Sequence, residues 1–233
     1  MTKIDPIGPK DGEIPHISFS PLDEYHIIVT GGGLYKFFSF KTNDKKFVEL
    51  HSQINNKSNP RISDKITCHT WSSDSRLIVC TAEGDVIICH ESGEFKSVLP
   101  DSPNKGEKIH IVSVAPWSRG LVLGGKHGEI VIFDKQEDME APFKFMKQEQ
   151  YTVERATTEK PAITSIAITS TEDMIFFITS NNQLVRLNIS LDVNDDETFF
   201  NSVIYDFHSA RVTGLDVCIR KQLAVTCSED KSI

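Results

Sequence analysis

The sequence predicts an all-β fold: a partial β-propeller with four complete four-stranded blades and the start of a fifth. Three observations support this prediction. Short runs of β-branched and aromatic residues alternate with clusters of Gly, Asn, Asp and Pro, which is typical of short antiparallel strands. No segment keeps a helical period of apolar residues. A unit of strand, tight turn and strand recurs five times, at a spacing typical of propeller blades.

The repeated unit is a hairpin whose turn contains a residue suited to positive φ. Its copies cover residues 27–38, 77–88, 121–132, 175–186 and 223–233. The equivalent turn positions are Gly33, Gly84, Gly128, Asn182 and Lys231, which are 51, 44, 54 and 49 residues apart. Short hairpin turns need positive φ, which Gly and Asn adopt at the least cost.

An apolar strand is expected before each hairpin and a more polar, outer strand after it. The preceding strands are predicted at 14–20, 66–71, 109–115, 163–168 and 212–218, and the following strands at 46–50, 95–99, 143–146 and 203–207. Pro21 and Pro116 lack an N–H, so each should help to end the strand before it. The prediction is one propeller domain, divided into an extension (1–13), blades (14–50, 64–99, 108–151 and 162–207) and an incomplete WD blade (208–233).

Composition excludes several classes of function. The chain has 25 Lys and Arg against 33 Asp and Glu, a net charge of -8 that argues against nucleic-acid binding. No apolar run reaches the roughly 20 residues of a membrane span, and the first residues, 1–6, contain no apolar stretch of signal-peptide length. The eight histidines show no paired metal-ligand spacing, so we expect no metal and no cofactor.

The five cysteines occur singly, without a C-x-x-C pair, and are expected to be reduced thiols. Cys80 and Cys89 lie on adjacent strands of one hairpin, nearly symmetric about its turn, so they could face each other across the ladder. Two glycine-rich segments, 31–33 and 124–128, look like phosphate loops. A second strand follows each at once, whereas a phosphate loop needs a helix there, so we interpret both as hairpin turns.

One set of residues resembles a catalytic triad: His208, Ser228 and Asp230. Ser228 does not lie on a strand-to-helix elbow, and no oxyanion loop is apparent, so we predict no catalytic residue. The spacing instead resembles the WD-repeat pattern, in which a His before the first strand, a Ser or Thr on the second and an Asp in the turn form a buried network. That network holds the strands and turn of a blade in register. The fold predicted is therefore a WD40-type propeller.

The last repeat also resembles one family in particular. Residues 212–233, with the Cys218-Ile219-Arg220-Lys221 bend between two strands, resemble the cilia- and flagella-associated protein 57 family of WD-repeat proteins. Shorter matches to that family's first propeller are residues 19–21, 29–33, 68–71 and 181–184. The resemblance spans roughly residues 14–233, and it is sharpest in the last repeat.

The resemblance implies a non-enzymatic scaffold of the ciliary axoneme, part of the cytoskeleton. Family members have tandem propellers followed by coiled coil, and they help to anchor inner dynein arms on doublet microtubules. The implied partners are inner-arm dynein or regulatory complex subunits and doublet microtubule proteins in a large complex, with no nucleic acid and no membrane. An alternative is a cytosolic WD-repeat adaptor for a ubiquitin ligase or a trafficking complex.

Two further expectations concern the surface. Long polar loops between the blades, at 52–63, 101–107, 136–141, 152–160 and 192–201, are candidate contact surfaces. An open set of four blades exposes sheet faces and strand edges at both ends. We therefore expect either that the chain is a segment of a longer protein or that a partner completes the propeller.

Overall fold

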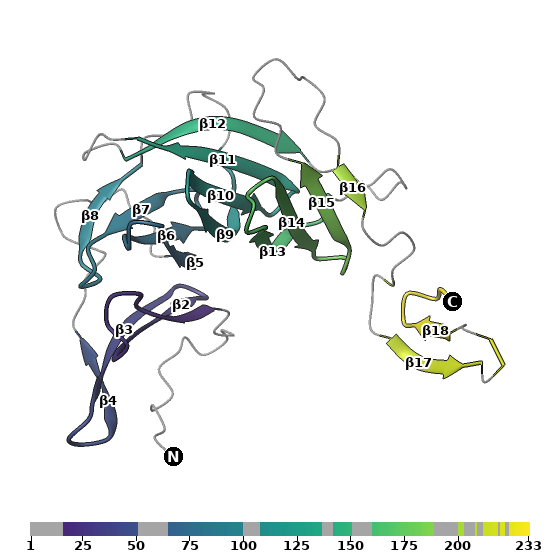
Figure 1. Ribbon diagram of the computed structural model, residues 1–233, viewed down its shortest axis with the longest axis horizontal. Helices are drawn as coiled ribbons and strands as arrows, with labels where there is room; N and C mark the ends of the chain where they lie inside the picture. Colours follow the sequence, from purple (N-terminus) through teal and green to yellow (C-terminus); the bar gives the residue numbers. More distant parts are fainter. Residues whose placement is uncertain are drawn as a thin grey trace.

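The computed structural model describes residues 16–50, 65–99, 108–136, 142–150, 160–188, 200–202, 208, 212–218, 220–221 and 224–233. Within these residues every element is a strand, and there is no helix that could span a membrane. The strands form four antiparallel sheets of four strands and one of two. Figure 1 shows the sheets following one another in chain order along an open arc.

Each of the four larger sheets is a meander whose strands are hydrogen-bonded in chain order. Sheet 1 consists of β1 (His16–Phe19), β2 (His26–Gly31), β3 (Leu34–Lys41) and β4 (Lys46–Leu50). Sheet 2 consists of β5 (Ile66–Trp71), β6 (Leu77–Thr81), β7 (Val86–Cys89) and β8 (Phe95–Val98). Sheet 3 consists of β9 (Ile111–Trp117), β10 (Gly120–Gly125), β11 (Glu129–Lys135) and β12 (Phe143–Gln150). Sheet 4 consists of β13 (Ile163–Ile168), β14 (Met174–Thr179), β15 (Leu184–Asn188) and β16 (Phe200–Ser202), and sheet 5 of β17 (Val212–Val217) and β18 (Ala224–Ser228).

The repeated turn has the backbone geometry that the sequence predicts. The φ angles of its five key residues are all positive: Gly33 80°, Gly84 86°, Gly128 82°, Asn182 57° and Lys231 66°. In sheet 2 the Gly84 N–H donates to the Thr81 carbonyl at 3.1 Å, and the Thr81 N–H donates to the Asp85 carbonyl at 3.0 Å. This pair of bonds, which recurs in sheets 4 and 5, defines a three-residue loop with a type I turn and a left-handed residue.

Three apolar layers of the core lie between successive sheets, and a smaller cluster of Ile27, Val29 and Phe38 lies on the other face of sheet 1. Ile28 and Phe37 of sheet 1 pack against Leu77 and Ile87 of sheet 2. A second layer joins sheets 2 and 3, and a third joins sheets 3 and 4. Because sheets 2 and 3 are covered on both faces, β6, β7 and β10 are buried at every position. This explains why these strands are continuous apolar runs rather than alternating ones.

The structure corrects several strand boundaries. β9 does not end at Pro116, which lies inside the strand opposite Leu121, and β9 continues to Trp117. Proline is tolerated there because β9 is the edge strand of its sheet and has a partner on one side only. In sheet 4 the outer strand observed is β16, whereas the strand predicted at 203–207 lies outside the described residues.

The two cysteines expected to face each other do not do so. Cys89 lies opposite Leu77, and Cys80 lies opposite Val86 on one side and Cys68 on the other. Because the loop has three residues, the two strands pair symmetrically about residue 83. Residue 80 therefore pairs with 86 and residue 89 with 77, not with each other. Cys80 packs in the layer shared with sheet 3 and Cys89 in the layer shared with sheet 1, which places them on opposite faces.

Candidate functional site

The site predicted from the sequence lies at the hairpin of sheet 5. His208 is buried, with its Nδ1 3.5 Å from Asp230 Oδ1 and 2.7 Å from Ser232 Oγ. Its Nε2 lies 2.7 Å from Thr226 Oγ1 on β18. Ser228 lies next to the turn, where its Oγ accepts the backbone N–H of Asp230 at 3.2 Å. The structure thus brings His208 and Asp230 together, while Ser228 supports the turn.

Sequence reasoning missed Thr226 and Ser232 in this cluster. Thr226 precedes Ser228 by two residues, so the two side chains share one face of β18, and a period of two could have identified it. Ser232 is tied to Asp230 Oδ1 through its N–H at 2.9 Å and its Oγ at 2.6 Å. These bonds link the loop before β17, the strand β18 and the turn after it.

The geometry of this cluster favours a structural role. Thr226 Oγ1, His208 and Asp230 follow one another in the order of a triad, but Thr226 lies within the β17–β18 ladder, opposite Leu215. A hydroxyl in the middle of an extended strand is not placed as on a strand-to-helix elbow, where neighbouring backbone N–H groups converge on an oxyanion. The cluster satisfies buried polar groups and fixes the hairpin.

A second polar cluster joins sheets 1 and 2 and is centred on His69 of β5. Its Nδ1 lies 2.7 Å from Thr30 Oγ1 on β2, and its Nε2 lies 2.7 Å from Ser18 Oγ on β1. Trp71 Nε1–H donates to the same Ser18 Oγ at 3.0 Å. Since Ser18 accepts from Trp71, its own proton is available for His69 Nε2, and His69 Nδ1–H can donate to Thr30. Every member is satisfied when His69 is neutral.

Burial makes the neutral form of His69 strongly preferred. The imidazole is 6% exposed, and its ring centroid lies 6.2 Å from that of His16. Burial, and secondarily the charge of His16, lowers the pKa of His69 to about 4. Burial also lowers the pKa of His16. At neutral pH the polar contact between sheets 1 and 2 therefore contains an uncharged imidazole. Such a set of polar contacts between two neighbouring sheets is called a joint below.

An ion pair occupies the joint between sheets 2 and 3. Lys108, just before β9, places its Nζ 2.7 Å from Oδ1 of Asp85, whose side chain is 8% exposed. The Asp85 N–H donates to Thr81 Oγ1 at 3.0 Å, and Thr81 Oγ1 lies 3.4 Å from Asp85 Oδ2. The turn that contains Gly84 also packs closely against the segment before β9. A Cβ added at Gly84 would lie 2.6 Å from the Ile109 carbonyl oxygen.

The joint between sheets 3 and 4 uses hydroxyl and carboxylate groups. Ser113 Oγ of β9 donates to the Ile163 carbonyl of β13 at 2.6 Å. Glu172 accepts the Ser118 N–H at 2.7 Å and also accepts the Ser118 hydroxyl. These bonds from Ser118 hold the pKa of the Glu172 carboxyl below its usual range. Each of the three joints thus uses a different set of polar groups.

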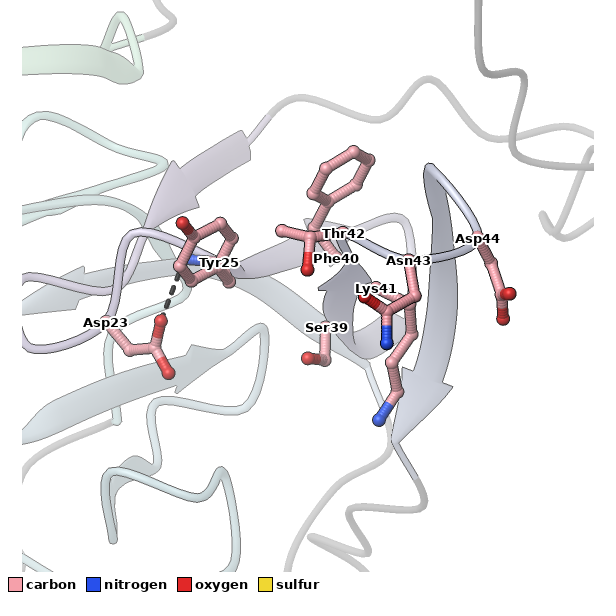
Figure 2. Close-up of a pocket in the computed structure, with 8 residues that line it drawn as sticks. All are labelled: Asp23, Tyr25, Ser39, Phe40, Lys41, Thr42, Asn43 and Asp44. Atoms are coloured by element: carbon pink, nitrogen blue, oxygen red, sulfur yellow. Dashed lines mark hydrogen bonds between the residues drawn. The ribbon is translucent and has the colours of Figure 1, made fainter.

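A shallow pocket of about 410 Å³ lies at the outer end of sheet 1. Figure 2 shows its lining, which comes from the β1–β2 turn, the end of β3 and the β3–β4 turn. Asp23 Oδ1 accepts the Tyr25 N–H at 2.8 Å, and Asp23 Oδ2 lies 3.3 Å from His26 Nδ1. The carboxylate is therefore engaged in shaping its own turn. Within the described part of the chain, no group of three or more His, Cys, Asp or Glu side chains could hold a metal.

Comparison with known proteins places these features in a family. No family model matches the chain. The chain is 31% identical over 228 residues to cilia- and flagella-associated protein 57 A of Tetrahymena thermophila, covering 94% of this chain and 17% of that protein. It is 23% identical over 270 residues to cilia- and flagella-associated protein 57 of Mus musculus, covering 96% of this chain and 21% of that one. The chain thus spans about a fifth or less of the length of these relatives.

Solved structures similar to this one are β-propellers or share their architecture. The β-propeller domain of Cps50 (Swd1) from Myceliophteria thermophila superposes with a TM-score of 0.61 at 12% identity, covering 92% of this chain and 67% of that one. The periplasmic gluconolactonase PpgL of Pseudomonas aeruginosa superposes with a TM-score of 0.58 at 10% identity, covering 92% and 63%. At such identities the likeness concerns the fold alone, and it confirms the predicted partial propeller. By sequence, this chain is a relative of the cilia- and flagella-associated protein 57 family, as its last repeat predicted.

Proposed function

We propose that this chain is part of a non-enzymatic WD-repeat scaffold of the ciliary axoneme. In this proposal it docks inner dynein arm or associated regulatory subunits on doublet microtubules. The observation that carries the proposal is the 31% identity, over 94% of the chain, to a protein named for its association with cilia and flagella. Related proteins from a ciliate and a mouse have the same name, which supports a ciliary or flagellar location.

The use of buried polar groups supports a role in binding rather than catalysis. His69, Asp85 and His208 are buried, and each is hydrogen-bonded to groups that connect strands or sheets. A catalytic acid or base needs instead to face a space that substrate can occupy. We propose that His208, Asp230 and Ser228 form the structural network of a WD blade, and that the five sheets belong to one propeller domain.

The partner surface proposed is the set of long loops between the sheets, most of whose residues lie outside the described part of the chain. Loops held by a rigid β scaffold are common binding surfaces because the scaffold fixes where they begin and end. The acidic segment 192–197 would suit a basic partner surface.

The test is recovery of the tagged chain from demembranated axonemes of a ciliated cell. We expect the protein to stay with the axoneme after detergent extraction and to co-purify with inner-arm dynein or regulatory subunits. A variant with Gly-Ser sequence in place of 192–197 should fold normally and bind less. The matched control places the same Gly-Ser sequence at 101–106, a polar segment of equal length with one Asp and one Lys, and should keep wild-type binding.

Recovery of the wild-type chain in the detergent-soluble fraction alone would contradict the proposal. Co-purification there with ubiquitin-ligase or coat subunits would support the adaptor alternative instead.

A further inference from the structure

Two of the five cysteines are directly opposed across adjacent strands. Cys68 of β5 and Cys80 of β6 are register partners in sheet 2. Both are 0% exposed, and both belong to the apolar layer that joins sheet 2 to sheet 3. Cys89 lies on the other face of the sheet, and Cys218 and Cys227 are exposed. The register places no other pair of cysteines opposite each other.

We propose that Cys68 and Cys80 form a reversible disulfide that locks β5 to β6 beneath sheet 3. The oxidant is a low-molecular-weight disulfide such as oxidised glutathione. The thiolate of one cysteine attacks the oxidant and releases one thiol, giving a mixed disulfide. The other cysteine, as thiolate, then attacks the protein sulfur and releases the second thiol. Two protein thiols are thus oxidised while one disulfide is reduced to two thiols.

The spacing of the strands makes this bond feasible and labile. Opposed residues of an antiparallel pair have Cβ atoms about 4.5–5.5 Å apart, whereas a disulfide needs about 3.5–4.5 Å. Closing the bond must draw the two strands together by roughly an ångström. An irregularity in register lies immediately before Cys68, where Thr67 is the extra residue, and such bulges let a strand bend. A bond formed under such tension is easily reduced, as in regulatory disulfides.

Burial controls when the pair can react. The hydrogen bond with the Cys68 thiol, together with burial, holds the pKa of the Cys80 thiol well above its ordinary value. The thiolate is the reactive form, so the closed sheet is inert towards the oxidant. Reaction therefore requires the apolar layer between sheets 2 and 3 to open transiently. The disulfide should form only when that layer has opened.

The test uses the whole chain with Cys218→Ser and Cys227→Ser, which leaves three cysteines. The protein is incubated with oxidised glutathione from 25 °C up to just below its unfolding temperature, quenched in acid, denatured and titrated for thiols. We expect two thiols to disappear together, faster at higher temperature. Mass spectrometry should find a peptide pair linked through Cys68 and Cys80, and dithiothreitol should restore both thiols.

Two variants separate this pair from other thiol chemistry. Cys80→Ala should abolish the paired loss, whereas Cys89→Ala, which removes a buried thiol on the opposite face, should leave it intact. The oxidised protein should also have a higher Tm, because the link constrains the unfolded chain. The proposal fails if all three thiols survive, if the products are stable mixed disulfides with glutathione, if Cys89 is in the link, or if the Tm falls.

Discussion

Single polar side chains connect the sheets, and each joint uses different chemistry. His69 bridges two hydroxyls of sheet 1, the Lys108–Asp85 pair joins sheets 2 and 3, and Ser113 reaches the backbone of sheet 4. A buried polar group without a partner costs about 1–3 kcal/mol, so these groups are tolerated only while the sheets stay in register. The joints therefore make the packing of neighbouring sheets specific.

The His69 joint predicts loss of stability in acid. The folded-state pKa of His69, about 4, lies below the ordinary value of 6.5, so the unfolded chain takes up the proton first. Its contribution is present above pH 6.5 and is lost as pH falls towards 4. Between pH 7 and pH 5 the free energy of unfolding should fall by about 2 kcal/mol from this group. His16 acts in the same direction.

Thermal unfolding across this pH range measures the effect. In His69→Asn the acid-dependent loss should shrink, although the variant is less stable at pH 7. His90, exposed in the β7–β8 turn, provides the control, and His90→Gln should keep the wild-type pH dependence. An unchanged slope in His69→Asn would show that another group is responsible.

The Lys108–Asp85 pair predicts a coupling between two sheets. Lys108→Met should lower the free energy of unfolding by roughly 1–2 kcal/mol, because Asp85 is 8% exposed and loses the positive charge beside its carboxylate, while the half-exposed Lys108 limits the effect. Asp85→Asn in the Lys108→Met background should cost less than it does alone. Urea unfolding of the two single variants and the double variant measures this, and strict additivity would mean that the pair has no coupling.

Sequence patterns locate some of these residues and miss others, for physical reasons. His208 and Asp230 could be predicted because both lie at fixed positions around one hairpin. Thr226 could not be singled out because two hydroxyl residues, Thr226 and Ser228, lie two positions apart on the same face of β18. The pattern predicts Ser228 as the partner of His208, whereas the structure has Thr226. His69 and Lys108 could not be found in this way, since their partners lie on another sheet and become neighbours only through packing.

At the scale of elements, the β6–β7 hairpin depends on the glycine of its turn. Gly84 has a φ of 86°, and a Cβ there would meet the Ile109 carbonyl oxygen at 2.6 Å and the Lys108 Cβ at 2.9 Å. Gly84→Ala therefore combines backbone strain of about 1–3 kcal/mol with a clash against the next sheet. We expect a loss of about 3 kcal/mol or more, measured by urea unfolding.

The neighbouring Glu83→Ala is the matched control. Glu83 forms a surface ion pair with Lys65 at 2.8 Å, in which both side chains are exposed. Such pairs contribute about 0–1 kcal/mol, so this variant should remain close to wild type. A mild Gly84→Ala variant would mean that the turn can shift away from sheet 3.

The hairpins were predictable because their cues are local. A positive-φ residue between two apolar runs identifies the turn, whichever sheet lies beside it. The end of β9 was not predictable, because a proline ends a central strand but is tolerated in an edge strand. Its place at the edge follows from the order of strands in the sheet, which local sequence does not reveal.

At the scale of the whole molecule, the sheets at the two ends of the arc differ from those between them. β1 directs the half-buried His16 and Ser18 towards His69, but Ile17 and Phe19 on its other face are 66% and 65% exposed. In sheet 5, Leu215, Val217 and Val225 are also exposed. Figure 1 shows β1 to β4 and the β17–β18 hairpin at opposite ends of the arc. Both ends thus present apolar side chains, whereas sheets 2 and 3 have a neighbouring sheet on each face.

These exposed faces predict concentration-dependent self-association of the isolated chain. Contiguous apolar surface on a strand favours association with another sheet. Ile17→Thr with Phe19→Thr should reduce it, because Thr keeps the β-branched shape suited to a strand while removing apolar area. Light scattering during gel filtration should show a lower average mass, with little change in Tm because both side chains are largely exposed.

The control is Phe177→Ala, in the layer between sheets 3 and 4. It should instead lower the free energy of unfolding by about 3–5 kcal/mol and increase aggregation through unfolding. Equal association of the double-Thr variant and wild type would locate the contact elsewhere.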